Sequence, residues 1–183
     1  KDLTKWKIGK PKIWARGVDL KLFKPKKGRK RNKNPILLNV GRVSIEKNLE
    51  AFLDLDLPYE KWVVGDGPAL NFLRKKYPHV VFFGNKNKEE LEYYYNKADV
   101  FVFPSKTDTF GLVLLEAMAC GLPIAAYPVT GPIDVIGDSK AGYLSLDLKE
   151  ACLEALKIPR NIPRKYAETF SWYQTTKVFS SYI

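Results

Sequence analysis

The feature that most constrains the fold of this chain is an alternation of short apolar runs with helical stretches between Pro35 and Tyr127. The runs are apolar throughout, so each is predicted to be a strand buried on both faces. The predicted strands are 36–40, 62–64, 80–83, 100–103 and 123–127, and the predicted helices between them are 47–57, 69–77, 88–97 and 112–120. This alternation is typical of an α/β domain with a doubly wound, Rossmann-like parallel sheet. Ligands of such sheets bind beyond the carboxyl ends of the strands, so a site is expected in the loops that follow them.

The chain is predicted to contain one domain with a segment on either side. Its 183 residues, 45% of them hydrophobic, are enough for a single hydrophobic core. We expect a basic lead-in at 1–34, the α/β domain at 35–160, and a C-terminal helix that packs back on the domain at 161–183. Because the sequence begins with Lys1 rather than Met, we expect it to be a fragment or a processed product.

The net charge of +11 is concentrated in the first fifth of the chain. Residues 1–34 carry 14 Lys and Arg against 2 acidic residues, whereas residues 35–183 carry 17 against 18. A basic segment of this kind favours a polyanionic partner, either nucleic acid or an anionic membrane surface. The near-neutral remainder argues that binding such a partner is not the main function of the domain.

The cysteines and the hydropathy indicate a cytoplasmic protein, and the basic segment 1–34 favours a peripheral position at an anionic membrane surface. Cys120 and Cys152 do not form a disulfide framework, so both are expected to be buried free thiols in a reducing compartment. No apolar run reaches the roughly 18 residues of a membrane span, and no signal peptide opens the chain.

The loop after the first predicted strand has the composition of a diphosphate clamp. Gly41 allows close backbone approach, Arg42 offers a planar fork for phosphate oxygens, and Lys47 opens the next predicted helix. The alternative is a pair of solvated surface charges, with Lys47 offset by Glu46. The later run 65–70 begins like a dinucleotide fingerprint but has leucine in place of the third glycine, which disfavours hydride transfer; its first residues are either a tight turn or a ligand-facing loop.

A second candidate region combines two carboxylates with a helix start. Asp108 precedes the predicted helix 112–120, which is apolar except at Glu116 and is therefore expected to be buried. A buried carboxylate requires a hydrogen-bond donor, so Glu116 needs a partner. Glu116 lies about 7.5 Å along the helix axis from Gly111, and free amides between the two acids form an anion site. A ligand with a vicinal diol, a diphosphate and a second polyol fits this order.

These residues resemble a known family. The segment 108–111 followed by 116–123 resembles the E-x7-E region of retaining glycosyltransferases of family 4, which have the GT-B fold. The loop 41–48 resembles that family's diphosphate loop, and 16–25, 99–105 and 170–172 also match it. The resemblance runs from about residue 13 to the end of the chain. It implies one half of a GT-B fold, the C-terminal half that binds the nucleotide-sugar donor.

The resemblance also implies roles for individual residues in transfer of a hexose from a UDP- or GDP-sugar to a glycan or lipid-linked acceptor. Asp108 and Glu116 are the expected catalytic residues, with Glu116 on the ribose hydroxyls. The expected substrate-binding residues are Gly41, Arg42 and Lys47 for the diphosphate, Asn85 and Lys86 beside the base, and Thr109, Phe110, Gly111 and Leu112 with Asp108 around the donor sugar. No cofactor and no metal site are expected, since no cluster has metal-ligand spacing.

The sequence departs from the family pattern at two points. Asp108 stands where the family has a longer glutamate, and 183 residues hold only one of the two GT-B domains. A missing N-terminal acceptor domain or partner chain is therefore expected, and the isolated chain should bind donor but turn over poorly. Two other functions remain open: a glycoside hydrolase that uses Asp108 and Glu116, and a basic module for nucleic acid or a membrane surface.

Overall fold

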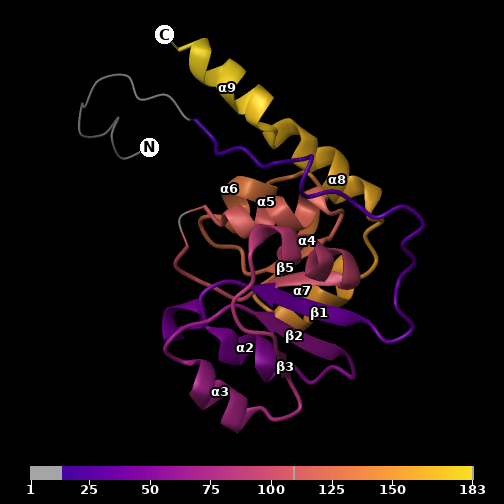
Figure 1. The fold of residues 1–183 in the computed structure, drawn as a ribbon, viewed down its shortest axis with the longest axis vertical. Helices are drawn as coiled ribbons and strands as arrows, with labels where there is room; N and C mark the ends of the chain where they lie inside the picture. The colour runs from indigo at the N-terminus through magenta and orange to yellow at the C-terminus, as the bar shows by residue number, and fades with distance from the viewer. Residues whose placement is uncertain (1–13, 109, 183) are drawn as a thin grey trace.

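The structure is a computed structural model that describes residues 14–108 and 110–182, in which the strands form one parallel, six-stranded sheet (Figure 1). The strand order is β3-β2-β1-β4-β5-β6. The strands are β1 (Ile36–Val40), β2 (Glu60–Val64), β3 (Val81–Phe82), β4 (Val100–Phe103), β5 (Ile124–Ala126) and β6 (Gly142–Leu144). This order is that of a doubly wound Rossmann-like sheet, so the fold class is confirmed. Strand β6 was not predicted.

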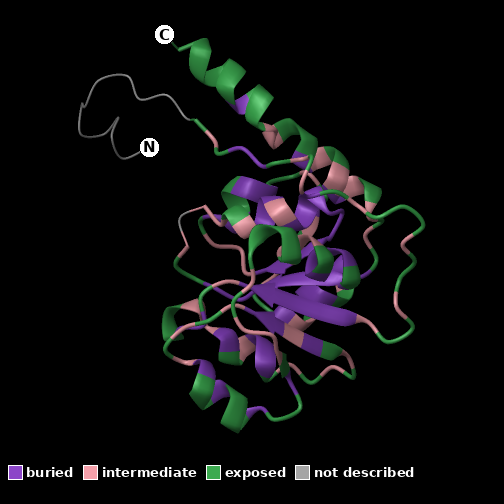
Figure 2. Cartoon of the chain, in the orientation of Figure 1, coloured by how far each residue is buried: buried purple, intermediate pink, exposed green. Residues whose placement is uncertain are grey.

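Helices cover both faces of the sheet (Figures 1 and 2). Leu37 of β1 packs with α2 (Leu49–Leu53), α3 (Leu70–Lys76) and α7 (Leu148–Ala155), whereas its neighbour Leu38 packs on the other face. That face is covered by α4 (Lys88–Lys97), α5 (Leu112–Ala119) and the short α6 (Pro132–Ile136). Because both faces are covered, the strands are apolar throughout, as their sequences are.

The two cysteines are buried free thiols on opposite faces of the sheet. Cys120 belongs to the core beside α5, and Cys152 belongs to the core beside α7. The sheet separates the two thiols, which excludes a disulfide between them in this fold.

The helix expected at 47–57 is shorter and begins differently. A 3-10 turn, η1 (Ile45–Lys47), comes first, and Asn48 then takes a left-handed conformation with φ of 52°. The Asn48 side chain donates to the carbonyl oxygen of Pro104 at 3.0 Å. This contact ties the loop after β1 to the end of β4, and α2 begins only at Leu49.

The described part of the basic segment packs on the domain. The Val18 amide donates to the Phe170 carbonyl at 2.8 Å, and Phe23 is 2% exposed in the core beside α4 and α5. Further along, Arg29 donates through Nε to the Asn96 carbonyl at 2.8 Å and through Nη2 to the Asp99 carboxylate at 3.0 Å. Residues 14–34 therefore form part of the folded unit.

The C-terminal region consists of two helices and not of one continuous helix. Helix α8 (Asn161–Ala167) packs against α5, and a 3-10 turn, η2 (Glu168–Phe170), leads to α9 (Trp172–Ser180). The Ser171 side chain accepts from the Gln174 amide and caps the start of α9. Helix α9 projects away from the sheet (Figure 1), and Thr175 is its buried residue. None of the helices within the described residues combines the length and the hydropathy needed to cross a membrane.

Candidate functional site

Two adjoining cavities lie at the carboxyl ends of β1 and β4, where the strand order reverses direction. Doubly wound sheets bind their ligands at this point. The first cavity has a volume of about 440 Å³ and the second about 480 Å³. Their shared wall is made of residues that follow β1 and open α5, namely Val40, Gly41, Arg42, Leu112 and Val113.

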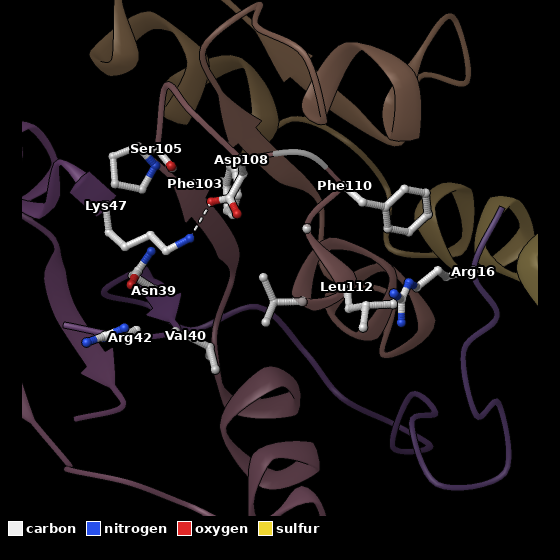
Figure 3. A pocket seen from close by; sticks show the side chains of 14 residues that line it. Arg16, Asn39, Val40, Arg42, Lys47, Phe103, Ser105, Asp108, Phe110 and Leu112 are labelled. Atoms are coloured by element: carbon white, nitrogen blue, oxygen red, sulfur yellow. Dashed lines mark hydrogen bonds and ion pairs between the residues drawn. The ribbon is translucent and has the colours of Figure 1, made fainter. Parts of the chain in front are cut away.

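The first cavity contains an ion pair between two of the predicted residues (Figure 3). Lys47 Nζ lies 2.7 Å from Asp108 Oδ2, and the two side chains are 31% and 20% exposed. Lys47 is the last residue of the 3-10 turn η1 and does not open a helix, and its charge is balanced by Asp108. Glu46 instead accepts from the Ser44 hydroxyl at 2.6 Å. Lys47 is therefore paired with Asp108, while the Ser44 hydrogen bond and the nearby charges of Arg42 and Lys47 lower the pKa of Glu46.

Arg42 is exposed on the shared wall and has no hydrogen-bond or ion-pair partner within 14–108 and 110–182. It follows Gly41, whose loop is in close contact with the loop after β2. A Cβ placed on Gly65, where φ is +138°, would lie 1.9 Å from the Gly41 carbonyl oxygen. Gly65 and Asp66 also line the second cavity. The segment at 65–68 is thus both a tightly packed turn and a cavity wall.

Helix α5 contributes its first residues to the first cavity. Gly111 begins the helix with φ of +76°, and Phe110, Gly111 and Leu112 line the cavity. Amides in the first turn of a helix have no intrahelical acceptor, so they favour an anion at this place. Leu112 is 40% exposed because it forms the cavity wall. The prediction that α5 is buried on all sides is therefore wrong for its first turn.

Glu116 lies one helical turn further along α5 and faces the second cavity. Its Oε2 accepts from the hydroxyl of the buried Tyr95 at 2.9 Å, which supplies the donor that its position on an apolar helix requires. Burial raises the pKa of Glu116, while the Tyr95 hydrogen bond and the nearby charge of Lys88 oppose this shift. Lys88 lines the second cavity together with Glu116.

The structure brings the predicted residues together in these two cavities. Gly41, Arg42, Lys47, Asp108, Phe110, Gly111 and Leu112 line the first cavity, and Asn85, Lys86 and Glu116 line the second. Lys86 also pairs with Glu90 at 3.2 Å, which raises the pKa of its ammonium group. Thr109 lies outside the described residues.

Sequence reasoning missed three polar residues of the first cavity: Arg16, Asn39 and Ser105. Asn39 is a polar residue inside an apolar strand, which is the signal that could have revealed it; its amide donates to the Val102 carbonyl at 2.9 Å. Ser105 is 2% exposed, and its hydroxyl has no partner in the described chain. Ser105 directly follows Pro104, so only its place after β4 pointed to the site.

Comparison with known proteins gives a consistent family assignment. The family model for glycosyl transferases group 1 matches residues 21–151. The chain is 37% identical over 145 residues to sulfoquinovosyl transferase of Arabidopsis thaliana, covering 72% of this chain and 28% of the relative. It is 36% identical over 149 residues to a GDP-mannose-dependent alpha-mannosyltransferase of Corynebacterium glutamicum, covering 75% of this chain and 36% of the relative.

A solved structure extends the similarity to most of the chain. Sucrose-phosphate synthase from Thermosynechococcus elongatus matches with a TM-score of 0.81 and 27% identity over 98% of this chain and 54% of that one. This chain therefore spans about a third of the length of the two relatives and about half of this structure. Together with the sheet order and the family match, these similarities show that the chain belongs to the group 1 glycosyl transferase family and has the Rossmann-like fold of one half of a GT-B protein.

Proposed function

We propose that this chain is the donor-binding, C-terminal half of a retaining glycosyltransferase that transfers a hexose from a nucleoside diphosphate sugar. The observation that carries the proposal is the placement of Arg42, Lys47, Asp108 and Glu116 around two adjoining cavities at the β1/β4 junction. The family membership and a relative named for its GDP-mannose donor support it. A whole enzyme would also need an acceptor domain, supplied by further chain or by a partner.

The two cavities would hold different parts of an extended donor. Arg42 stands on the shared wall with its guanidinium unpaired in the described structure, where it can hold diphosphate oxygens bidentately. The first amides of α5 favour the same anion. Asp108 and the residues at 110–112 would then hold the donor sugar in the first cavity. Glu116 would accept from ribose hydroxyls in the second cavity, with Asn85 and Lys86 beside the base.

The proposed enzyme requires no resident metal or cofactor, because Arg42, together with Lys47 once the ligand displaces Asp108, would balance the diphosphate charge that develops on the leaving group. We propose a glycan or lipid-linked acceptor and a cytoplasmic location. The isolated chain should bind donor and transfer slowly, because the domain that would position the acceptor and exclude water lies outside it.

Calorimetry with UDP, GDP and ADP tests the proposal. The wild-type chain should bind one of the three more tightly than the others. Arg42→Ala should weaken that binding about tenfold or more, the loss expected for a charge-assisted contact of about 1.5 kcal/mol or more. Glu116→Ala should weaken it because ribose hydroxyls lose their acceptor.

Two matched variants control for the loss of charge alone. Lys75→Ala removes an exposed cation on α3, and Glu89→Gln removes an exposed acid on α4; neither residue lines either cavity. Both should bind nucleotide like wild type. Failure of the wild-type chain to bind any of the three nucleotides, or equal binding of all three, would contradict the assigned roles.

A further inference from the structure

A third cavity, lined by cations, lies near the amino ends of the strands. It has a volume of about 200 Å³. Its lining residues come from the loop at 26–29 and from α4, and they are Lys26, Lys27, Gly28, Arg29, Tyr93, Asn96 and Lys97. We call it the basic cavity. The loop leads into the first residue of β1, so the basic cavity lies toward the amino ends of the strands, away from the donor cavities (Figure 1).

Arg29 forms the fixed part of the basic cavity. Its side chain is 13% exposed, and its Nε and Nη2 atoms donate to the carbonyls of Asn96 and Lys97 at 2.8 and 2.7 Å. Its Nη1 atom is buried and has no hydrogen-bond partner in the described chain. Arg29 therefore fixes the loop against the end of α4 and lines the wall of the basic cavity.

Exposed lysines surround this fixed guanidinium. Lys26 is 57% exposed, and Lys27 and Lys97 are also exposed. The chain on either side of the loop adds four more exposed cations: Lys24, Lys30, Arg31 and Lys33. The acidic groups nearby are Glu92, 3.8 Å from Lys26, and Asp99, which pairs with Arg29. Two carboxylates against eight cations leave a strong positive excess, so the ligand is an anion.

The environment of Tyr93 decides between two kinds of polyanion. Tyr93 is 46% exposed, but the ammonium groups of Lys26 and Lys97 each lie 5.5 Å from its ring centroid. These ammonium groups compete with a base for the face of the ring, which disfavours the stacking by which single-stranded nucleic acids bind. The small volume of the cavity also suits a phosphate group and not a nucleotide. Tyrosine beside lysines is instead typical of the headgroup region of a membrane.

We propose that the basic cavity and the surrounding loop 24–33 bind the phosphodiester headgroups of an anionic membrane surface. Arg29 fixes the loop in place, and the exposed Lys26, Lys27 and Lys97 hold the phosphate groups by charge. Because the basic cavity and the donor cavities lie at opposite ends of the strands, binding to the membrane leaves the donor cavities open. This binding does not depend on the nucleotide-sugar function.

Vesicle co-sedimentation with the full chain tests the proposal. Vesicles of phosphatidylcholine alone are compared with vesicles in which phosphatidylglycerol replaces part of it. The wild-type chain should bind the anionic vesicles at least tenfold more tightly, and added salt should reverse the binding. The double variant Lys26→Glu/Lys27→Glu should bind them at least tenfold more weakly. Its nucleotide affinity should stay unchanged, which separates this result from any failure of the donor-site assignment.

A charge-matched double variant provides the control. Lys75→Glu/Lys177→Glu changes two exposed lysines by the same total charge, on α3 and α9, and should bind anionic vesicles within about threefold of wild type. The comparison also separates the loop from the five lysines at positions 1–13, which all variants retain. Equal losses in both double variants would overturn the proposal, because they would show a dependence on net charge alone.

Two further arms distinguish the source of the phosphate. Inorganic phosphate and a single-stranded RNA oligonucleotide are each titrated against the wild-type chain. Tight binding of free phosphate without binding of anionic vesicles would overturn the membrane as the partner. RNA binding tighter than vesicle binding, and lost in Lys26→Glu/Lys27→Glu, would overturn it in favour of nucleic acid. Weak binding of both soluble probes alongside tight vesicle binding would support the proposal.

Discussion

Lys47 and Asp108 are separated by 61 positions in the sequence, yet their side chains form an ion pair of 2.7 Å in the first cavity. The cation proposed to hold a diphosphate is thus already neutralised by the carboxylate proposed to hold the donor sugar. A ligand must therefore compete with, or rearrange, this pair. The pair is partly exposed, so its own stabilisation is modest, about 1 kcal/mol or less.

Asp108→Asn should strengthen binding of the preferred nucleoside diphosphate about twofold to fivefold, because Lys47 then has no competing carboxylate. The same substitution should abolish any additional affinity that the sugar gives to the full donor. Calorimetry with the diphosphate and the diphosphate sugar measures both effects. Glu89→Gln, on α4 and outside both cavities, is the control and should change neither affinity. Unchanged or weaker diphosphate binding by Asp108→Asn would show that Lys47 does not contact the ligand.

Tyr95→Phe should shift the pH dependence of nucleotide binding to higher pH. The Tyr95 hydroxyl donates to Glu116 and favours its ionised form, so its removal raises the pKa of Glu116 further. The ionised carboxylate accepts from ribose hydroxyls, and affinity therefore falls as pH drops through this pKa. Affinity measured from pH 5 to 8 should give a higher midpoint for the variant. Superimposable profiles would mean that Tyr95 has a packing role only.

Glu116→Gln should raise the free energy of unfolding at pH 8. Burial raises the pKa of Glu116 above its ordinary value of 4.5, so the folded state disfavours the ionised form. The cost is present above the folded pKa and absent below the unfolded pKa. The gain in the variant should accordingly shrink as pH falls toward 4.5, which urea unfolding at a series of pH values measures. If the gain in free energy of unfolding does not change with pH, it arises from packing and not from the ionisation of Glu116.

Gly65→Ala should destabilise the chain by about 3 kcal/mol, because the new Cβ would overlap the Gly41 carbonyl. Gly28→Ala is the matched control: its φ is also positive, but no atom lies within 4 Å of the new Cβ. Only backbone strain of about 1 kcal/mol is expected there. Urea unfolding distinguishes the two, and equal losses would show that the contact between the two loops relaxes.

Native Cys120 and Cys152 should resist a thiol reagent at pH 8. Burial raises the pKa of both thiols to about 12, so little thiolate is present, and the reagent cannot reach either sulfur. In denaturant both should react within minutes. Rapid labelling of the folded chain would indicate that one face of the sheet opens locally.

Local signals account for the elements that the sequence predicted correctly. The bounds 36–40, 88–97 and 100–103 are those of β1, α4 and β4. Asn87 and Glu90 form a capping box at the start of α4, a signal contained within four residues. Because the alternation of strands and helices fixes a parallel sheet, the gathering of the predicted site residues at one edge could also be anticipated from the sequence.

Long-range contacts account for what the sequence did not predict. Strand β6 has three residues at the edge of the sheet, too few for a pattern, and is defined by its pairing with Ile124–Ala126. Asn48 interrupts a helical pattern because its side chain bonds to the carbonyl of Pro104, which directly follows β4. The ion pair of Lys47 with Asp108 arises only after β1 and β4 have paired.

The contacts of Arg29 limit where the chain can be truncated without losing stability. Its guanidinium bonds to backbone carbonyls at the end of α4 and to the buried carboxylate of Asp99. Trimming the chain at residue 34, where its composition changes, would leave those carbonyls uncapped and a negative charge buried without its cation. The minimal autonomous folding unit is accordingly larger than the ligand-binding unit, and a protease acting between them would release a destabilised fragment.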